Sequence, residues 1–231
     1  MVALLRLPPL AEEVPVHFRA NRRSRKYILK VGPDGSVRIT VPRFGSQRFA
    51  LDFASQHAAW LAGEIAKVRR HVAPWVPGHE FLLHGAPTPV TVEENEGRPQ
   101  AVFGTFRLPL ASAEADLRAA VVRELRRLAA AELPLRLTER ALAMGLGERV
   151  TRVTVRDQRS RWGSCSARGV ISLNWRLIQM PRWVADSILI HELSHLRELN
   201  HSSRFWKAVA ESDPQWQESE AWLHRHRGLL I

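Results

Sequence analysis

The stretch His191-Glu192-Leu193-Ser194-His195, with a further histidine at position 201, carries the most information about this chain. On a helix, residues four positions apart lie one turn above one another, so both histidine rings of the stretch point to the same side and can share one ion. Glu192 lies beside the pair without blocking the ion. Three protein ligands leave one coordination position open for water, which is typical of catalytic rather than structural zinc sites. The spacing therefore predicts one zinc ion per chain, bound by His191, His195 and His201.

The residues around this stretch predict a buried helix from about Arg182 to Leu199, with Pro181 in its first turn. Val184 and Ile188 share a stripe with the two histidines, so both rings fall on the face that is expected to be buried. Two neighbouring polar rings in a core need a shared partner. Either a metal ion or hydrogen bonds within the core would satisfy them, and the spacing favours the metal.

The third ligand requires the helix to end, because His201 would lie on a different face if the helix continued past the second histidine. Asn200 tolerates the left-handed conformation that ends many helices, and Ser202 or Ser203 can cap the next helix. Such a turn would return His201 to the other two rings. Two carboxylates on the last predicted helix are the competing third ligands, Glu218 and Glu220.

The chemistry expected from this group is hydrolysis by a metal-activated water, with Glu192 as the general base. Zinc lowers the pKa of coordinated water to about 7, and the resulting hydroxide can attack a carbonyl or a phosphoryl centre. Glu192 then returns the proton to the leaving group. The motif predicts a metal-dependent hydrolase and leaves both kinds of substrate open.

The composition indicates a soluble globular protein, because 45% of the 231 residues are hydrophobic. The single cysteine, Cys165, excludes an internal disulfide framework, and with no export signal in the sequence the cytoplasm is the expected location. A lone cysteine is usually a small buried apolar residue, so we do not expect Cys165 to bind the metal. No membrane partner is expected.

The formal net charge of +11 has two explanations. Surfaces that bind phosphate collect Lys and Arg, so the charge would suit contact with a nucleotide or a nucleic acid through a basic surface. A genome with a biased composition would also enrich a chain in arginine. The net charge alone does not choose between these two explanations.

The N-terminal part of the chain, from 14 to about 110, alternates mostly as strands do. Two β-rich runs within 27–41 flank a Gly-Pro-Asp-Gly turn and predict a hairpin. One helix, capped by Ser46, should follow and continue to about residue 70. Three short strands should lie between 81 and 108.

The remainder has mostly helical periodicity. With Ser112 as its cap, a long helix should run to about Glu132, and Pro134 should kink or end it before a further helix reaches Gly145. Short strands are predicted at 150–155 and 170–173, and the last two helices at 204–210 and 215–225.

These patterns predict an α+β fold in three parts: an N-terminal arm at 1–13, a β-rich N-terminal region at 14–110 and a metallohydrolase domain at 111–231. The arm begins with apolar residues, but Arg6 and two prolines interrupt them. It therefore fits neither a signal peptide nor a membrane helix, and we expect it to be loose.

A second unusual stretch, residues 159–166, combines guanidinium groups, an aromatic ring and small residues between two predicted strands. It could bind an anion through Arg159, Arg161 and Ser164, because guanidinium forks match phosphate geometry. It could equally pack against the histidine-bearing helix. Both interpretations remain open at this level.

Four segments together resemble the YgjP-like metallopeptidase family, which is related to SprT-like and WLM zinc proteases: RWGSCS at 161–166, ISLN at 171–174, HELSH at 191–195 and HSSRFW at 201–206. The resemblance covers nearly the whole chain, since the basic hairpin from Arg22 to Pro42 is also similar to the family. It implies a zincin-like catalytic domain with a HExxH helix, His191, His195 and His201 as zinc ligands, and Glu192 as the catalytic acid and base. The resemblance to SprT-like proteases also raises DNA-linked proteolysis, although the sequence shows no separate DNA-binding module. Glu198 stands where metzincins have glycine, so the turn before the third histidine must be made differently.

Three functions follow from these observations. The first is a zinc-dependent metallopeptidase acting on a peptide or protein substrate. The second is a metal-dependent nucleotide pyrophosphohydrolase, suggested by four arginines near the motif, Arg159, Arg161, Arg168 and Arg176. Solvation or ion pairing would explain these arginines equally well. The third is a non-enzymatic nucleic-acid binder with a structural metal, against which the open coordination position and Glu192 argue.

Overall fold

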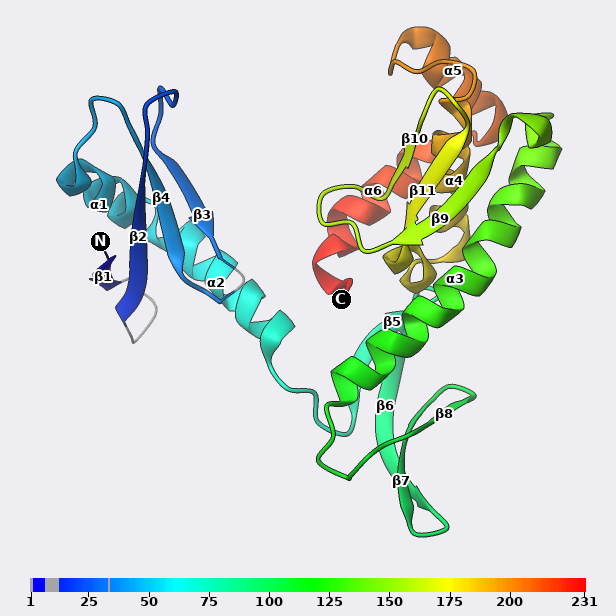
Figure 1. The fold of residues 1–231 in the computed structure, drawn as a ribbon, viewed down its shortest axis with the longest axis horizontal. Coiled ribbons are helices and arrows are strands. Elements are labelled where there is room, and N and C mark those ends of the chain that lie inside the picture. Colours follow the sequence, from blue (N-terminus) through cyan, green and yellow to red (C-terminus); the bar gives the residue numbers. More distant parts are fainter. Residues whose placement is uncertain (1, 7–12, 33) are drawn as a thin grey trace. The chain divides into compact units, whose positions relative to one another are not determined.

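The computed structural model describes residues 2–6, 13–32 and 34–231 and divides the chain into two compact units (Figure 1). The N-terminal unit comprises residues 1–73 and the C-terminal unit residues 74–231. From the sequence, we predicted a boundary near residue 110 instead, where the strand-like alternation gives way to helical periodicity. The difference arises because the strands between 79 and 109 share one core with the helix that follows them, where Phe81 and Phe103 pack in the same cluster as Leu125.

The N-terminal unit is a four-stranded sheet covered on one face by two helices (Figure 1). Its strand order is β1 (Val2–Arg6), β2 (Glu13–Asn21), β4 (Val37–Pro42) and β3 (Ile28–Val31), with only the β2–β4 pair parallel. The predicted hairpin is confirmed as β3 and β4. Residues 2–6, expected to form a loose arm, instead pair with β2; residues 7–12 of that arm lie outside the described residues.

The helical layer of this unit consists of α1 (Gln47–Gln56) and α2 (Ala58–Val72). Ser46 caps α1 as predicted, because its side chain accepts a hydrogen bond from the N–H of Phe49 at 3.1 Å. The single predicted helix is broken at His57, whose N–H bonds to the carbonyl only three residues back. The shared core is apolar and comes from both layers: Val14, Val16, Val37, Ile39, Ala50, Ala54, Leu61 and Ile65.

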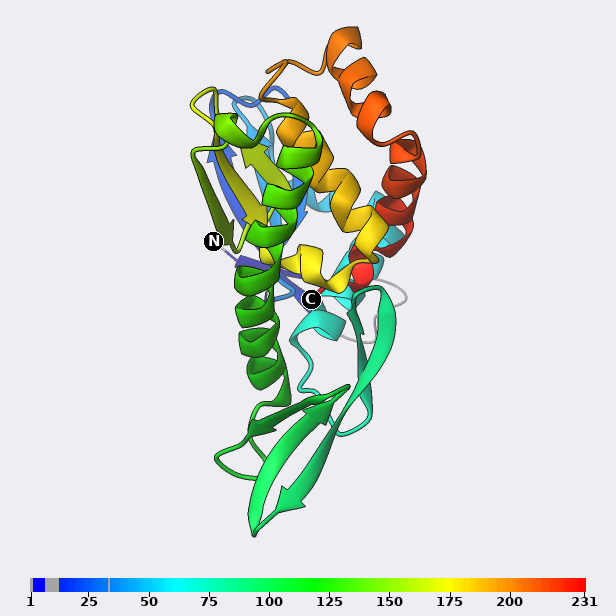
Figure 2. The ribbon, with the colours of Figure 1, turned by 90° about the vertical axis from the view of Figure 1, so that its right-hand side faces the viewer.

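The C-terminal unit begins with an antiparallel sheet of four strands, where three were predicted. They are β5 (His79–Leu83), β6 (Ala86–Asn95), β7 (Arg98–Phe103) and β8 (Phe106–Pro109). The helix α3 (Leu117–Ala143) then runs from this sheet to the far end of the unit (Figure 2). Asp116, not Ser112, caps it, accepting from the N–H of Ala119 at 3.0 Å.

Pro134 lies inside α3, so the two helices predicted on either side of it form one continuous helix. A proline in a helix removes one hydrogen bond and tends to break the helix. Here the buried stripe continues on both sides, with Leu128 and Leu133 before and Leu137 after the turn at the proline. Packing of this stripe against the core outweighs the local preference.

A second sheet in this unit has the order β10 (Gly163–Cys165), β11 (Val170–Asn174), β9 (Arg152–Arg156), with β11 parallel to β9 and antiparallel to β10. The strands predicted at 150–155 and 170–173 are present, and β10 is an unpredicted edge strand within the second unusual stretch, residues 159–166. Three helices follow: α4 (Arg182–Ser194), α5 (Ser203–Ser212) and α6 (Trp216–His226). Short 3-10 turns at Gly147–Arg149, Trp175–Gln179 and Arg227–Leu229 complete the unit.

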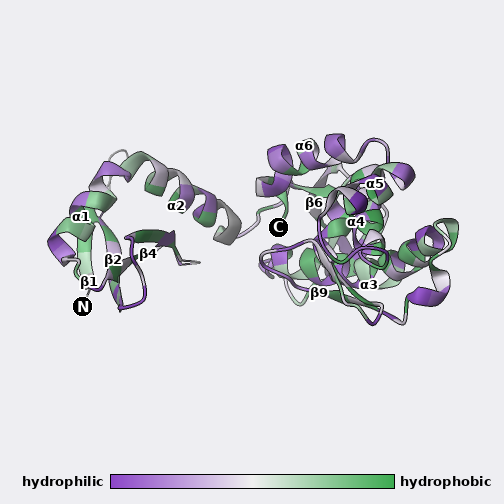
Figure 3. Ribbon diagram, turned by 90° about the horizontal axis from the view of Figure 1, so that it is seen from above, coloured by the Kyte–Doolittle hydropathy of each residue, from purple (hydrophilic) through white to green (hydrophobic). Residues whose placement is uncertain are grey.

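The helix α4 is the most buried of these three. Figure 3 shows that α4 is mostly hydrophobic, whereas α6 carries many hydrophilic residues. Polar contacts also tie α4 to α3. Asp186 of α4 accepts hydrogen bonds from Arg136 and, at 2.8 Å, from Arg140. The fold class is α+β, as predicted. Among the described residues, no helix has the length and apolar character needed to span a membrane.

Candidate metal centre

The helix α4 ends at Ser194, so His191 lies in its last turn and His195 directly after it. We expected the helix to continue to Leu199. It ends earlier because the next N–H groups bond to the carbonyls of Leu193 and Ser194, which tightens the last turn. The expected left-handed conformation at Asn200 is wrong, since Asn200 does not have a positive φ angle. The chain therefore turns before Asn200, close to the second histidine.

The turn brings the three predicted ligands together. His191, His195 and His201 each offer one ring nitrogen, and these nitrogens all lie within 4.8 Å of one another. The Nε2 atoms of His191 and His201 are 3.1 Å apart. In the described part of the chain, the group of His, Cys, Asp and Glu side chains able to hold an ion consists of these three histidines. Neither Glu218 nor Glu220 belongs to it.

Burial keeps two of these rings neutral. It lowers the pKa of His191 to about 4, assisted by the charges of His195 and His201, and burial also lowers the pKa of His195. A neutral imidazole has one lone pair free to bind a cation. Three converging nitrogen donors of this kind form a set that zinc accepts, so the residues present fit the metal that the motif implies.

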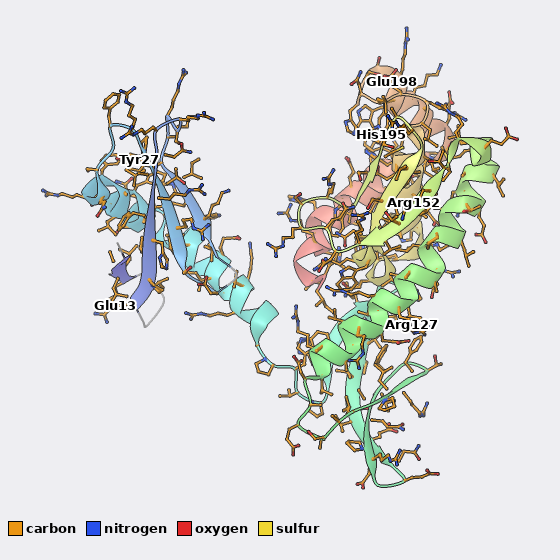
Figure 4. The ribbon with its side chains drawn as sticks, viewed as in Figure 1. Glu13, Tyr27, Arg127, Arg152, His195 and Glu198 are labelled. Atoms are coloured by element: carbon orange, nitrogen blue, oxygen red, sulfur yellow. The ribbon has the colours of Figure 1, made fainter. Side chains whose placement is uncertain are left out.

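The positions of the rings are set by their neighbours. The carbonyl of Glu198 lies 3.2 Å from Nδ1 of His195, which leaves the other ring nitrogen for the cluster; Figure 4 labels both residues at the same end of the C-terminal unit. Fully buried Phe205 packs against all three histidines, with ring centroids 4.9, 4.5 and 4.8 Å from His191, His195 and His201. Sequence reasoning missed Phe205, although it lies in the segment that follows the third histidine.

Phe205 is held there by the start of α5. Ser202 caps this helix, as one of the two predicted caps, by accepting a hydrogen bond from the Phe205 N–H at 3.4 Å. The next residue, Trp206, contacts His191 and His201 and stacks on Trp216 of α6 at 4.3 Å. The position of His201 thus depends on the packing of α5 rather than on a left-handed residue before it.

Glu192 is buried beside the cluster, with 5% of its surface exposed. Its Oε2 atom has no hydrogen-bond partner, which is costly for a buried carboxylate. Burial raises the pKa of Glu192 to about 7, while the charge of Arg161 partly offsets this effect. Gly163 of β10 makes room for the carboxylate, since a Cβ at that position would lie 2.5 Å from Oε1 of Glu192. This role of Gly163 was not predicted.

The three histidines and Glu192 line one cavity of about 500 Å³. The edge strand β10 forms part of its wall, and Trp206, Trp216 and Leu223 add apolar surface from α5 and α6. Glu220 also lines the cavity, away from the ligand group. The centre therefore lies in a hollow large enough for part of a substrate, and α5 and α6 contribute mainly apolar side chains to its wall.

The residues predicted to bind anions are only partly brought to this cavity. Arg161 and Ser164 line it, whereas Arg159 and Arg168 do not. Arg176 is committed elsewhere: its guanidinium donates to Asp157 at 2.6 Å and lies over the ring of Trp175 at 4.6 Å. One of the four arginines is thus available at the centre.

Cys165 also lines the cavity but does not belong to the ligand group, as expected. Burial raises the pKa of its thiol to about 11, and the negative charge of Glu192 acts in the same direction. In the metal-free chain the thiol therefore stays protonated at neutral pH, which makes it a weak nucleophile.

Comparison with known proteins gives one match that covers most of the chain. The sequence model of the YgjP-like metallopeptidase domain matches residues 25–226. Among solved structures, the chain is similar to the metallopeptidase zymogen abylysin of Pyrococcus abyssi, with 23% identity and a TM-score of 0.36 over 42% of this chain and 96% of that chain. No curated protein sequence matches.

Proposed function

The chain belongs to the YgjP-like metallopeptidase family, and on that basis we propose that it is a zinc-dependent peptidase. In this proposal His191, His195 and His201 hold one zinc ion and Glu192 is the general base. When bound, zinc supplies a Lewis acid that makes water more acidic and polarises the substrate carbonyl. Family membership supports metal-dependent hydrolysis, and the arrangement of this chain's own side chains supports the roles given to each.

Glu192 supplies the proton transfers. Its unpartnered Oε2 atom is an acceptor next to the ligand group. As water attacks the carbonyl carbon, Glu192 takes one of its protons while the new C–O bond forms. The buried environment then holds the carboxyl group in its neutral form until it delivers that proton to the leaving nitrogen, as the C–N bond breaks. No other proton carrier is needed for this sequence.

The free edge of β10 is the observation that most supports a peptide as the substrate. The pairs Trp162–Asn174 and Ser166–Val170 are hydrogen-bonded, so the backbone groups of Gly163 and Cys165 between them are directed away from β11. An extended peptide can bind such an edge as an added strand. Both residues line the cavity that contains the histidines, so a peptide bound there would run past Glu192.

The nucleotide alternative has less support. A triphosphate site needs several cations facing the phosphates, as in sites that hold them with Arg and Lys clamps. Arg161 is the one arginine of the four that lines the cavity, and α5 and α6 contribute mainly apolar side chains to its wall. A side chain of a peptide suits that wall better than a polyphosphate does.

The test is turnover of a mixed panel of quenched peptides and nucleoside triphosphates by zinc-loaded protein, with products identified by mass spectrometry. We expect peptide cleavage that falls by at least about 100-fold in Glu192→Gln. Glu148→Gln is the matched control, because Glu148 is an exposed carboxylate outside the cavity. Glu192-dependent release of pyrophosphate without any peptide cleavage would replace this proposal with the nucleotide one.

A further inference from the structure

The positive charge of the chain is concentrated in the N-terminal unit. Residues 1–73 contain thirteen Lys and Arg against five Asp and Glu, so this third of the sequence carries +8 of the net +11. Arginine itself is spread evenly, with ten in residues 1–73 and twenty in residues 74–231, so the excess charge of this unit comes from its lysines and its small number of acidic residues. The peptidase proposal makes no use of this unit. Its charge therefore calls for an anionic partner of its own.

Within the unit, the charge gathers on two loops at one edge of the sheet. One loop follows β2 and the other follows β4, and these parallel neighbours end side by side with Asn21 opposite Pro42. Four arginines from the two loops line a cavity of about 750 Å³: Arg22, Arg23, Arg25 and Arg43. No acidic side chain lines this cavity, and none of the four arginines makes an ion pair within the described part of the chain.

Aromatic rings line the same cavity. Phe44 is 92% exposed and Phe49 is 55% exposed, although large apolar side chains are normally covered. The guanidinium of Arg43 lies over the Phe44 ring, 5.1 Å from its centroid. We call the hollow formed by the four arginines with Phe44 and Phe49 the basic-aromatic groove.

The groove is held in shape by contacts beneath it. The Tyr27 hydroxyl accepts a hydrogen bond from the N–H of Ser46 at 2.9 Å, and its ring lies 5.1 Å from that of Phe49. Asn21 fixes the first loop, because its carbonyl accepts from Ser24 and its side chain from Arg23, both at 3.0 Å. Figure 4 labels Tyr27 beside α1 and Glu13 at the opposite end of β2. These contacts order the backbone of both loops, so binding costs little backbone entropy there.

We propose that the basic-aromatic groove binds single-stranded nucleic acid. Arginine forks contact phosphates, and exposed rings stack on bases, which is how proteins bind single strands without sequence preference. A duplex hides the faces of its bases from such rings. An anionic membrane surface is the alternative partner for exposed arginines and rings, and the experiment below separates the two.

The experiment measures fluorescence anisotropy of a labelled, mixed-sequence 12-nucleotide single strand with the full chain at several salt concentrations. Phe44→Ala should weaken binding by at least about fivefold, because each base stacked on an aromatic ring contributes that much or more. Arg22→Ala with Arg43→Ala should weaken binding and make the slope of log K against log salt shallower by roughly 0.7 for each phosphate that the double variant no longer neutralises. Arg38→Ala, which removes one positive charge from an exposed site on β4 outside the groove, should have little effect.

Circular dichroism checks that each variant folds; these side chains are exposed, so we expect no change. Stronger binding of the single strand than of the same sequence as a duplex supports the proposal. Equal binding of both forms, an equal loss in Arg38→Ala, or no binding at 50 mM salt overturns it. Binding to phosphatidylserine vesicles that requires Phe44, without binding of the oligonucleotide, overturns it in favour of a membrane surface. Binding needs no zinc, so the result is independent of the peptidase proposal.

Discussion

Gly163 and Glu192 approach each other so closely that a single added carbon would force them apart. A Cβ on Gly163 would lie 2.5 Å from Oε1 of Glu192 and 2.6 Å from its Cδ. The Glu192 carboxylate therefore occupies the space that a side chain at position 163 would need, and glycine leaves this space free. The proposed general base and the proposed peptide-binding edge are in this way parts of one arrangement.

Gly163→Ala should displace the Glu192 carboxylate and reduce kcat by roughly 100-fold, because a shift of about 1 Å in a catalytic group has that order of effect. Zinc content and fold should not change. The measurements are steady-state kinetics with the cleaved peptide and metal analysis of the same sample. Gly228→Ala is the matched control, since nothing lies within 4 Å of a Cβ there. An unchanged kcat in Gly163→Ala would mean that the position of this carboxylate does not limit catalysis.

Protein purified without chelator should contain about one zinc per chain, and a chelator should abolish turnover until zinc is returned. His201→Ala should weaken zinc binding by more than about 100-fold, because it removes one of three converging nitrogens. Glu218→Ala and Glu220→Ala should leave the affinity unchanged, as neither carboxylate belongs to the group. Competition with a zinc-binding dye measures all three. A comparable loss in a carboxylate variant would move the third ligand to α6.

The histidine pair was predictable because it depends on local geometry alone. A spacing of four residues on a helix brings His191 and His195 to one side whatever the rest of the fold does. The hairpin of β3 and β4 was predictable for the same reason, since its turn sequence specifies the backbone. The return of His201 was also expected, but its cause was misjudged. The turn depends on hydrogen bonds after Ser194 and on the packing of α5, and neither has a local sequence signal.

The features that sequence reasoning missed all depend on contacts between distant segments. Gly163 precedes Glu192 by 29 residues, and only the folded unit brings β10 against α4. The same applies to Pro134, which signals a break that the buried stripe of α3 overrides. The predicted boundary near residue 110 was misplaced because the alternation of polar and apolar residues identifies strands but does not show which hydrophobic core they join. Local patterns therefore predicted secondary-structure elements and motifs, whereas the contacts between these elements depend on tertiary packing.

Phe205→Ala should disturb the metal centre without touching a ligand. The three histidine rings pack on this buried side chain, so its removal should lower the free energy of unfolding by about 3–5 kcal/mol and loosen the rings. Phe205→Leu, which keeps an apolar group there, should cost less stability but still weaken zinc binding. Denaturant unfolding of the metal-free protein and zinc titration separate the two effects. Wild-type zinc affinity in a folded Phe205→Leu would show that the ring is only a core residue.

Arg161 distinguishes the two substrate classes, because it is the arginine at the cavity and its planar fork suits phosphate. If peptides are the substrate, Arg161→Lys and Arg161→Ala should change KM for a neutral peptide by less than about threefold, with no difference between low and high salt. If a phosphate group binds there, both variants should raise KM, since lysine keeps the charge but loses the fork. Salt should then raise the wild-type KM and have less effect in Arg161→Ala, where the charge is gone. The comparison requires that both variants fold and retain zinc, which metal analysis establishes. A salt-sensitive increase of KM in both variants would therefore support a phosphate-containing substrate. In that case a nucleobase, rather than a peptide side chain, would pack against the apolar surface of Trp206 and Trp216.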